Sequence, residues 1–328
     1  MGLGAGATAA TRPHYGGTLR VEIREDIETA DPPETGHGLA DLAAAFGIER
    51  WEAGRLAVYS AAENAAGGRP YLDSVEIQLG RPLREQAIDL ELGKADVVEL
   101  SPNEVRRPGG NRRIWSSAPV RLVALAFGPR VADARIRQAL ALAVDRAAIH
   151  NVLLQGQGEI SGGLLPQWIS GYAFVFSTAT DLNRARSLVA GVTPAARVLS
   201  LSVEDPGLRT IADRIALNAR DAGLMVSVSA GSANADARLV EARIESADPM
   251  AALAGLARAL GLGEAPPAAD SAEGWFNAEN TLLQGYRVIP LFHLPYVYGV
   301  GPRVRGGPGI TPLGAWRFGD LWVEGNRP

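Results

Sequence analysis

The side chains that could do chemistry in this sequence are its histidines, one serine beside two glycines, and two short glycine motifs. The histidines are His14, His37, His150 and His293. No two of them stand at the spacing of ligands to a shared metal ion. Ser161, in Glu159-Ile-Ser-Gly-Gly163, lacks the glycine two residues earlier that a serine hydrolase elbow requires. Gly156-Gln-Gly158 and Gly299-Val-Gly301 lack the third glycine of a dinucleotide-binding loop. The pattern predicts a protein that is not an enzyme and holds no metal or cofactor.

The composition excludes several other classes of function. The chain has 328 residues, of which 47% are hydrophobic and 21% charged, so it is long enough for two lobes of ordinary domain size. A net charge of −4 argues against nucleic acid as the main partner, because phosphate binding needs a surplus of basic charge. No run approaches the roughly 18 consecutive apolar residues of a membrane span. The absence of cysteine excludes disulfides and thiolate chemistry.

Hydrophobic periodicity gives the elements that must position any site. Alternating residues such as Val75, Ile77 and Leu79 predict a strand, whereas apolar residues at helical spacing predict helices. Strands are expected over 17–23, 75–79, 198–203, 223–228 and 288–292, and helices over 83–92, 133–149, 181–189, 208–222 and 250–260. Short helical pieces are expected over 38–46 and 49–64, after a loop over 28–37. The strand, helix and strand between 198 and 228 predict a parallel α/β lobe.

The helix expected over Asp133–Ile149 is the most informative of these elements. Ile136, Leu140 and Val144 share one face, and Asp133 is a suitable N-cap. Within it, Ile136-Arg-Gln-Ala-Leu-Ala-Leu-Ala-Val-Asp-Arg146 resembles the V-R-x-A-L-x-x-A-I-D-R signature of family 5 solute-binding proteins. These are the oligopeptide-, dipeptide- and nickel-binding subunits of ABC importers.

Further short motifs resemble the same family, in the family's order along the chain. They are Gly17-Thr-Leu-Arg-Val21, Arg69-Pro-Tyr-Leu-Asp73, Gly163-Leu-Leu-Pro166 with Gly171-Tyr172, Asp181 to Val189, and Val288-Ile-Pro-Leu-Phe292. The chain departs from the family between the first strand and Arg69, where only residues 24–68 replace an extended segment with a third, smaller domain. That segment lines part of the ligand pocket in the relatives, so the class of ligand does not carry over with the resemblance.

The resemblance implies an α/β fold of the periplasmic-binding-protein type II-like class, with two lobes, a hinge and a central cleft. We expect lobe I to be discontinuous, comprising residues 1–170 and 288–328, and lobe II to comprise residues 171–287. Such proteins work by hinge closure, in which the ligand contacts both lobes and stabilises the closed state.

Aromatic side chains near the expected crossover between the lobes are candidates for contact with a ligand, because binding clefts are commonly lined by aromatic and a few polar groups. Trp168 and Tyr172 lie in a loop between Pro166 and Gly171, and Trp275 lies in the second lobe. Core packing is the alternative for each aromatic. His293 is a further ligand candidate, and its alternative is a core histidine with its hydrogen bonds satisfied.

The family's amine-binding segment, W-x-A-D-Y-x-D-P, resembles Ala242-Arg-Ile-Glu-Ser-Ala-Asp-Pro249 in this chain. The resemblance places Glu245 where an aspartate holds the ammonium group of a peptide, so its carboxylate could hold a cation. Asp248 is a second candidate, with a helix N-cap before Pro249 as its alternative. Ala242 replaces the family's tryptophan, and Gly128 replaces an asparagine near the ligand, so a peptide ligand is less strongly implied.

The resemblance therefore predicts an extracytoplasmic or periplasmic protein that captures a small-molecule or peptide-like ligand and delivers it to an ABC transporter permease. Contact with a membrane would occur only through that permease. The alternative is a shortened, non-transporting scaffold that acts as a ligand sensor or interaction protein. Residues 1–15 lack the charged start and apolar region of a secretory signal, whereas Ala7-Thr-Ala-Ala10 resembles the end of a cleavage region. We expect a mature exported protein with its signal removed, and the alternative is a disordered tail on a cytoplasmic protein.

Overall fold

The computed structural model describes residues 12–28, 39–107, 111–232 and 234–324. The cleavage region expected at Ala7–Ala10, and all but the first residue of the loop expected over 28–37, lie outside these ranges. Contacts divide the chain into two compact units, unit 1 (Met1–Ser116 and Val297–Pro328) and unit 2 (Ser117–Tyr296). This partition differs from the lobes predicted from the sequence, whose boundaries near 170 and 288 remain a prediction.

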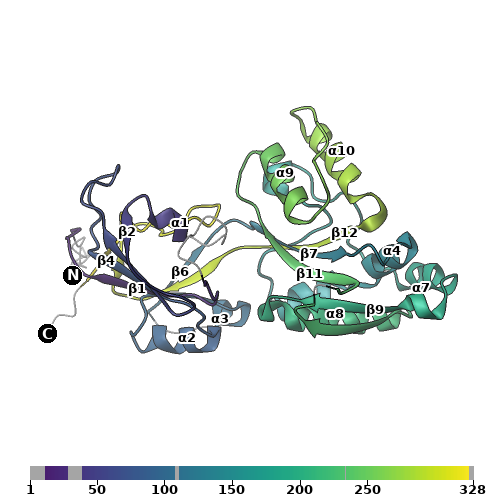
Figure 1. Cartoon of the computed structure of the whole chain (residues 1–328), viewed down its shortest axis with the longest axis horizontal. Helices are drawn as coiled ribbons and strands as arrows, with labels where there is room; N and C mark the ends of the chain where they lie inside the picture. Colours follow the sequence, from purple (N-terminus) through teal and green to yellow (C-terminus); the bar gives the residue numbers. More distant parts are fainter. Residues whose placement is uncertain (1–11, 29–38, 108–110, 233, 325–328) are drawn as a thin grey trace, which may run out of the picture. The chain divides into compact units, whose positions relative to one another are not determined.

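Unit 1 is built on a seven-stranded sheet with the order β2-β3-β4-β1-β5-β13-β6 (Figure 1). Its strands are β1 (Thr18–Glu22), β2 (Phe46–Glu52), β3 (Leu56–Ala61), β4 (Ser74–Gln78), β5 (Val97–Glu99), β6 (Arg113–Ser116) and β13 (Val297–Val300). Its helices are α1 (Leu39–Leu42), α2 (Leu83–Glu91) and α3 (Pro102–Arg106), and β14 (Val304–Arg305) pairs with β15 (Trp322–Val323). Strand β1 runs parallel to β4 and β5, and its alternate residues Leu19 and Val21 are fully buried.

The expected helical piece over residues 49–64 is wrong, because β2 and β3 form an antiparallel hairpin there. Gly54 has a φ of +63°, a left-handed conformation that favours glycine and ends the first strand in a turn. Val58 and Tyr59 then follow as residues that favour strands, and Tyr59 is buried opposite Val75 of β4. Pairing with β4 outweighs the local helix-forming residues around it.

Unit 2 contains a six-stranded mixed sheet with the order β10-β9-β11-β7-β12-β8. Its strands are β7 (Arg121–Phe127), β8 (Glu159–Ile160), β9 (Val198–Val203), β10 (Met225–Ala230), β11 (Ala237–Arg243) and β12 (Val288–Leu294). Strand β9 runs parallel to β10 and β11, as expected for an α/β lobe, whereas β7 is antiparallel to β11 and β12. The predicted α/β class is confirmed in both units.

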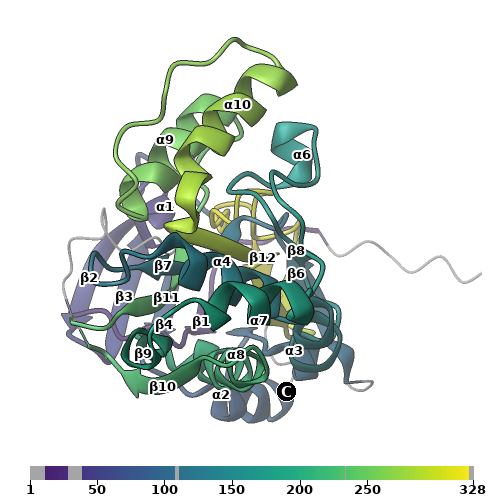
Figure 2. The same cartoon turned by 90° about the vertical axis from the view of Figure 1, so that its right-hand side faces the viewer.

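Helices cover both faces of the unit 2 sheet (Figures 1 and 2). In both views α9 and α10 lie on one face, and α4, α7 and α8 lie on the other. The helices are α4 (Ala134–Ala143), α5 (Arg146–Ala148), α6 (Gln167–Ser170), α7 (Leu182–Ala190), α8 (Arg209–Asp221), α9 (Pro249–Ala259) and α10 (Ala272–Leu283). Short 3-10 turns occur at Pro194–Arg197, Pro206–Leu208 and Gln284–Tyr286, and one π-helical turn at Ile149–Leu153. No helix in the described ranges is long and apolar enough to cross a membrane.

The single helix expected over Asp133–Ile149 is only partly confirmed. Asp133 caps α4 as predicted, by accepting the backbone N–H of Arg135 at 2.9 Å. The helix ends at Ala143, because Val144 is extended with a ψ of 115°. Asp145 then accepts the N–H of Ala148 and begins α5. An aspartate side chain competes well for free N–H groups at a helix start, so Asp145 marks a new start within the predicted helix.

Candidate functional site

Four of the six candidate ligand residues gather around one segment of unit 2, Ser161–Tyr172. Trp168 and Tyr172 lie on this segment itself. His293 lies on β12, and Trp275 lies on α10 next to Phe276, whose ring meets that of Tyr172 edge-on at a centroid distance of 5.4 Å. The other two candidates, Glu245 and Asp248, lie in the exposed turn between β11 and α9. The structure thus places Trp168, Tyr172 and His293 at one segment, with Trp275 on the helix whose Phe276 packs against it, and places the acidic candidates elsewhere.

The backbone of Leu164 is held by two buried titratable side chains, one at its N–H and one at its carbonyl oxygen. Glu279, which is 0% exposed, accepts the backbone N–H groups of Leu164 and Leu165 and the hydroxyl of Tyr172. On the other side, Nε2 of His293 lies 2.8 Å from the carbonyl oxygen of Leu164. A carbonyl oxygen only accepts hydrogen bonds, so His293 carries its proton on Nε2. These bonds fasten the segment to α10 and β12.

Burial sets the charge of these groups. Burial raises the pKa of the Glu279 carboxyl to about 7, although the hydrogen bonds from Tyr172, Leu164 and Leu165 favour the ionised form. Burial also lowers the pKa of His293 to about 4, so the ring is neutral at pH 7. The pKa of Tyr172 is raised by burial and by the neighbouring Glu279. Glu279 is therefore the group in this network that titrates near neutral pH.

Two glycines allow close approaches to the segment from two sides. A Cβ atom at Gly163 would lie 2.6 Å from Oε1 of Glu279, inside van der Waals contact. Gly163 is thus required for the carboxylate of Glu279 to reach the backbone. A Cβ at Gly162 would lie 2.9 Å from Cγ2 of Thr178 and closer still to the carbonyl oxygen of Phe176, so Gly162 allows the chain around residues 176–178 to approach the segment.

Trp168 and Phe174 present apolar surface around the fastened segment. Trp168 is 42% exposed, and its indole N–H points to the carbonyl oxygen of Pro119 at 3.4 Å. Phe174 is 48% exposed. Exposed aromatic side chains on a segment held by buried hydrogen bonds are suited to contact a ligand, because little side-chain freedom is lost on binding.

Asp248 caps a helix, which was the alternative expected for it. Its carboxylate accepts the N–H of Ala251 at 2.8 Å, and Pro249 occupies the first helical position of α9. Replacing Asp248 with Ala is expected to lower the free energy of unfolding by about 1 kcal/mol, measured by urea denaturation. The control Glu245→Ala, in the same exposed turn, is expected to change it by less than about 0.5 kcal/mol. Equal losses for the two variants would contradict the capping role.

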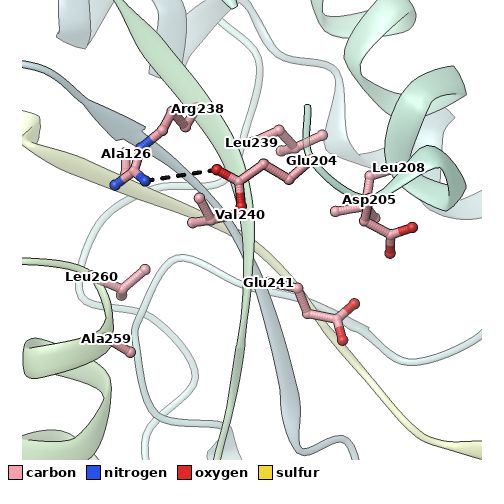
Figure 3. A pocket seen from close by; sticks show the side chains of 10 residues that line it. All are labelled: Ala126, Glu204, Asp205, Leu208, Arg238, Leu239, Val240, Glu241, Ala259 and Leu260. Atoms are coloured by element: carbon pink, nitrogen blue, oxygen red, sulfur yellow. Dashed lines mark ion pairs between the residues drawn. The ribbon is translucent and has the colours of Figure 1, made fainter. Parts of the chain in front are cut away.

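A cavity of about 280 Å³ (the larger cavity) lies beside β11, between the end of β9 and the end of α9 (Figure 3). Its polar lining comes from Glu204, Asp205, Glu241 and Arg238. Glu204 and Arg238 extend towards one another and form a long ion pair of 4.0 Å. Such an exposed pair contributes little to stability, so both groups can exchange partners with a ligand. The other two carboxylates already have partners, since Glu241 pairs with Arg121 at 3.2 Å and Asp205 accepts the backbone N–H of Gly207 at 2.7 Å.

Sequence analysis missed Glu279 and the residues of the larger cavity. Glu279 follows Trp275 by one helical turn and precedes Leu282 and Leu283, both buried. A glutamate on the apolar face of a helix was therefore the available signal. Glu204 and Glu241 gave no such signal, because strand-end carboxylates are usually solvated. Among the described residues, no group of three or more histidine, aspartate or glutamate side chains is arranged to hold a metal ion.

Comparison with known families gives the decisive observation. The model for bacterial extracellular solute-binding proteins, family 5 middle region, matches residues 35–261. The chain belongs to this family. The family 5 signature found over 136–146 lies within the matched region and includes α4 and the start of α5. No curated protein matches the chain at the sequence level.

This chain resembles several solved structures in its fold. NikA from Staphylococcus aureus, in complex with Ni(L-His)2, is 16% identical with a TM-score of 0.71, over 85% of this chain and 68% of its own. A dipeptide-binding protein from Pseudoalteromonas sp. SM9913, in complex with Met-Leu, is 14% identical with a TM-score of 0.71, over 85% and 64%. AgaA from A. tumefaciens R10, in complex with agropinic acid, is 16% identical with a TM-score of 0.71, over 88% and 70%.

These structures confirm the periplasmic-binding-protein type II-like fold class expected from the sequence. The family 5 chain is shorter than the proteins it resembles, since it spans only 63% to 70% of their length. The ligands named for the three structures differ in chemistry: a metal complex, a dipeptide and an opine acid. Fold similarity therefore does not identify the ligand of this chain, which has to be inferred from the residues of the chain itself.

Proposed function

We propose that this protein captures a small solute outside the cytoplasm and delivers it to an ABC transporter permease, without making or breaking a bond. The observation that carries the proposal is the family 5 match over residues 35–261, which includes most of the elements of both units. Hinge closure around the solute would produce the conformation that the permease recognises, because the bound solute stabilises whichever state it contacts best.

Within unit 2, the aromatic side chains around Ser161–Tyr172 are the proposed contacts for the solute. Trp168 offers the most exposed ring on this segment, Tyr172 packs against Phe276 of α10, and Trp275 is the residue before Phe276 on that helix. Glu245 is the proposed partner for a cationic group at the exposed turn, and Asp248 would approach the same group. His293 is a proposed contact through Nδ1, the ring nitrogen that does not bond to Leu164.

Replacing Trp168 with Ala is expected to weaken solute binding about tenfold, because interface tryptophans contribute strongly to affinity. The probes are Met-Leu, Ni(L-His)2 and agropinic acid, each tested for a saturable rise in melting temperature. At least one class is expected to bind the wild-type protein. The control Met225→Ala removes another apolar side chain of unit 2. Met225 lies on β10 and is 67% exposed. Equal weakening by both substitutions would contradict a role for Trp168.

A further inference from the structure

A second, smaller cavity of about 90 Å³ lies beside His293 in unit 2. Its polar lining consists of Glu159, Ser161, Gln167 and His293, and Phe174 contributes an aromatic wall. A water molecule takes up about 30 Å³ of liquid volume, so the cavity has room for one small chemical group or a few waters. This cavity is separate from the larger one in Figure 3, with which it shares no lining residue.

Two hydrogen-bond acceptors face one another in this cavity. Because Nε2 of His293 donates to Leu164, the other ring nitrogen, Nδ1, carries a lone pair. Nδ1 lies 3.6 Å from Oε1 of Glu159, which is too far for a direct hydrogen bond. Burial lowers the pKa of His293 to about 4, so the ring does not supply the proton at neutral pH. A hydrogen-bond donor placed between Nδ1 of His293 and Oε1 of Glu159 would satisfy both acceptors.

The neighbouring groups favour a donor that comes from outside the protein. The hydroxyl of Ser161 donates to the carbonyl oxygen of Gly163 and accepts the N–H of the same residue. Burial raises the pKa of the Glu159 carboxyl, whereas the backbone N–H of Gln167 donates to it and favours its ionised form. Phe174 adds a ring that attracts cations through its face. A compact cation with several N–H groups fits this combination of carboxylate, imidazole and aromatic ring.

We propose that the His293–Glu159 cavity binds a primary ammonium group, which donates one N–H to Nδ1 of His293 and another to the carboxylate of Glu159. The proposal deepens the proposed function, on which it rests, by assigning an amine to the captured solute. The amine would also reach the Ser161–Tyr172 segment through a chain of hydrogen bonds, because the same imidazole holds the carbonyl oxygen of Leu164.

The test uses ethylammonium as the probe and tetramethylammonium, a larger cation without N–H groups, as the comparison. Binding is followed through the ¹⁵N signal of His293 Nδ1, which is resolvable because the chain has only four histidines. A ligand of this size is expected to reach a Kd no tighter than about 1 mM. Saturable binding of ethylammonium with a shift of the His293 signal, and none of tetramethylammonium, supports the proposal. No saturation at about 0.1 M, or equal binding of the two cations, overturns it.

Variants separate the role of Glu159 from misfolding and from other carboxylates. Glu159→Gln is expected to weaken ethylammonium binding at least tenfold, whereas Glu159→Asp keeps the charge and is expected to retain part of the affinity. Glu245→Gln is expected to leave it unchanged. If Glu245→Gln loses ethylammonium binding and Glu159→Gln keeps it, the proposal that the His293–Glu159 cavity binds the ammonium group is overturned. If a solute is still captured while ethylammonium is not, only this inference fails; if neither binds, the proposed function fails as well.

Discussion

Replacing Glu279 with Gln is expected to stabilise the folded protein above pH 7 by as much as about 3 kcal/mol. The ionised carboxylate is buried with no cation beside it among its hydrogen-bond partners, which are Leu164, Leu165 and Tyr172. A pKa of about 7, against an ordinary 4.5, corresponds to about 3 kcal/mol disfavouring the charged form. Glutamine is neutral at every pH and keeps a carbonyl acceptor of the same shape.

The pH dependence of this effect has a definite sign. Between pH 4.5 and about 7 the folded protein binds a proton at Glu279 that the unfolded chain does not, so this group makes wild-type stability fall as pH rises. His293 acts in the opposite direction, because its folded pKa of about 4 lies below the ordinary 6.5 and stability is lost as pH falls through that range. The two effects offset one another between about pH 4.5 and 6.5.

The difference between Glu279→Gln and wild type therefore isolates the carboxyl group. Measured by urea denaturation from pH 5 to pH 8, this difference is expected to grow in favour of the variant up to about pH 7 and then to level off. The control Glu279→Leu removes the acceptor of Leu164, Leu165 and Tyr172, and is expected to cost about 3 kcal/mol or more at pH 5. Its difference from wild type should change with pH in the same direction as that of the Gln variant, because leucine also lacks the titrating carboxyl. A Gln variant whose difference from wild type does not change with pH would contradict a buried, titrating Glu279.

Replacing Gly158 with Ala is expected to cost about 3 to 4 kcal/mol, from backbone strain and steric overlap together. Gly158 has a φ of +73°, and an added Cβ would lie 2.9 Å from Cδ2 of Leu294 and closer still to the carbonyl oxygen of His293. The overlap is with the backbone of β12, which cannot move without disturbing the sheet. The substitution should also weaken ethylammonium binding, because it displaces His293.

Gly156 is the matched control for this prediction. Its φ of +75° is nearly the same, but a Cβ there would meet nothing within 4 Å. Gly156→Ala is therefore expected to cost only the backbone strain, about 1 to 2 kcal/mol. Chemical denaturation of both variants gives the steric contribution by difference. Equal costs for the two variants would contradict the close approach of Gly158 to β12.

Local signals in the sequence predicted most of the longer helices but only a minority of the strands, and β7, β11 and α10 were not predicted. The strand β9 is confirmed at the residues expected, and Asp181 caps α7 by accepting the N–H of Arg184. Such signals act within one turn or one strand, so they can be read without knowledge of the rest of the chain. The hairpin of β2 and β3 was missed because it is stabilised by pairing with β4, which no local pattern reveals.

The site was less predictable than the fold, for a physical reason. Tyr172 and His293 could be selected by residue type, but their attachment to Leu164, through Glu279 or directly, depends on contacts between residues more than a hundred positions apart. Glu279 gave a signal only as a glutamate on the apolar face of a helix, and its hydrogen bonds to Leu164, Leu165 and Tyr172 connect residues that lie far from it in the sequence. Resemblance to the family predicted a role in binding for Glu245. In the structure, however, it is Glu159 that lies beside the imidazole of His293.

The most direct test of solute capture is native mass spectrometry of the freshly purified protein, followed by identification of any compound released on denaturation. We predict one defined small molecule bound in a one-to-one complex, which raises the melting temperature when it is added back. A compound that carries a primary amine would agree with the cavity at His293. A protein that carries nothing, and whose melting temperature is unchanged by peptides, amines, opines, sugars and metal complexes, would contradict a role in solute capture.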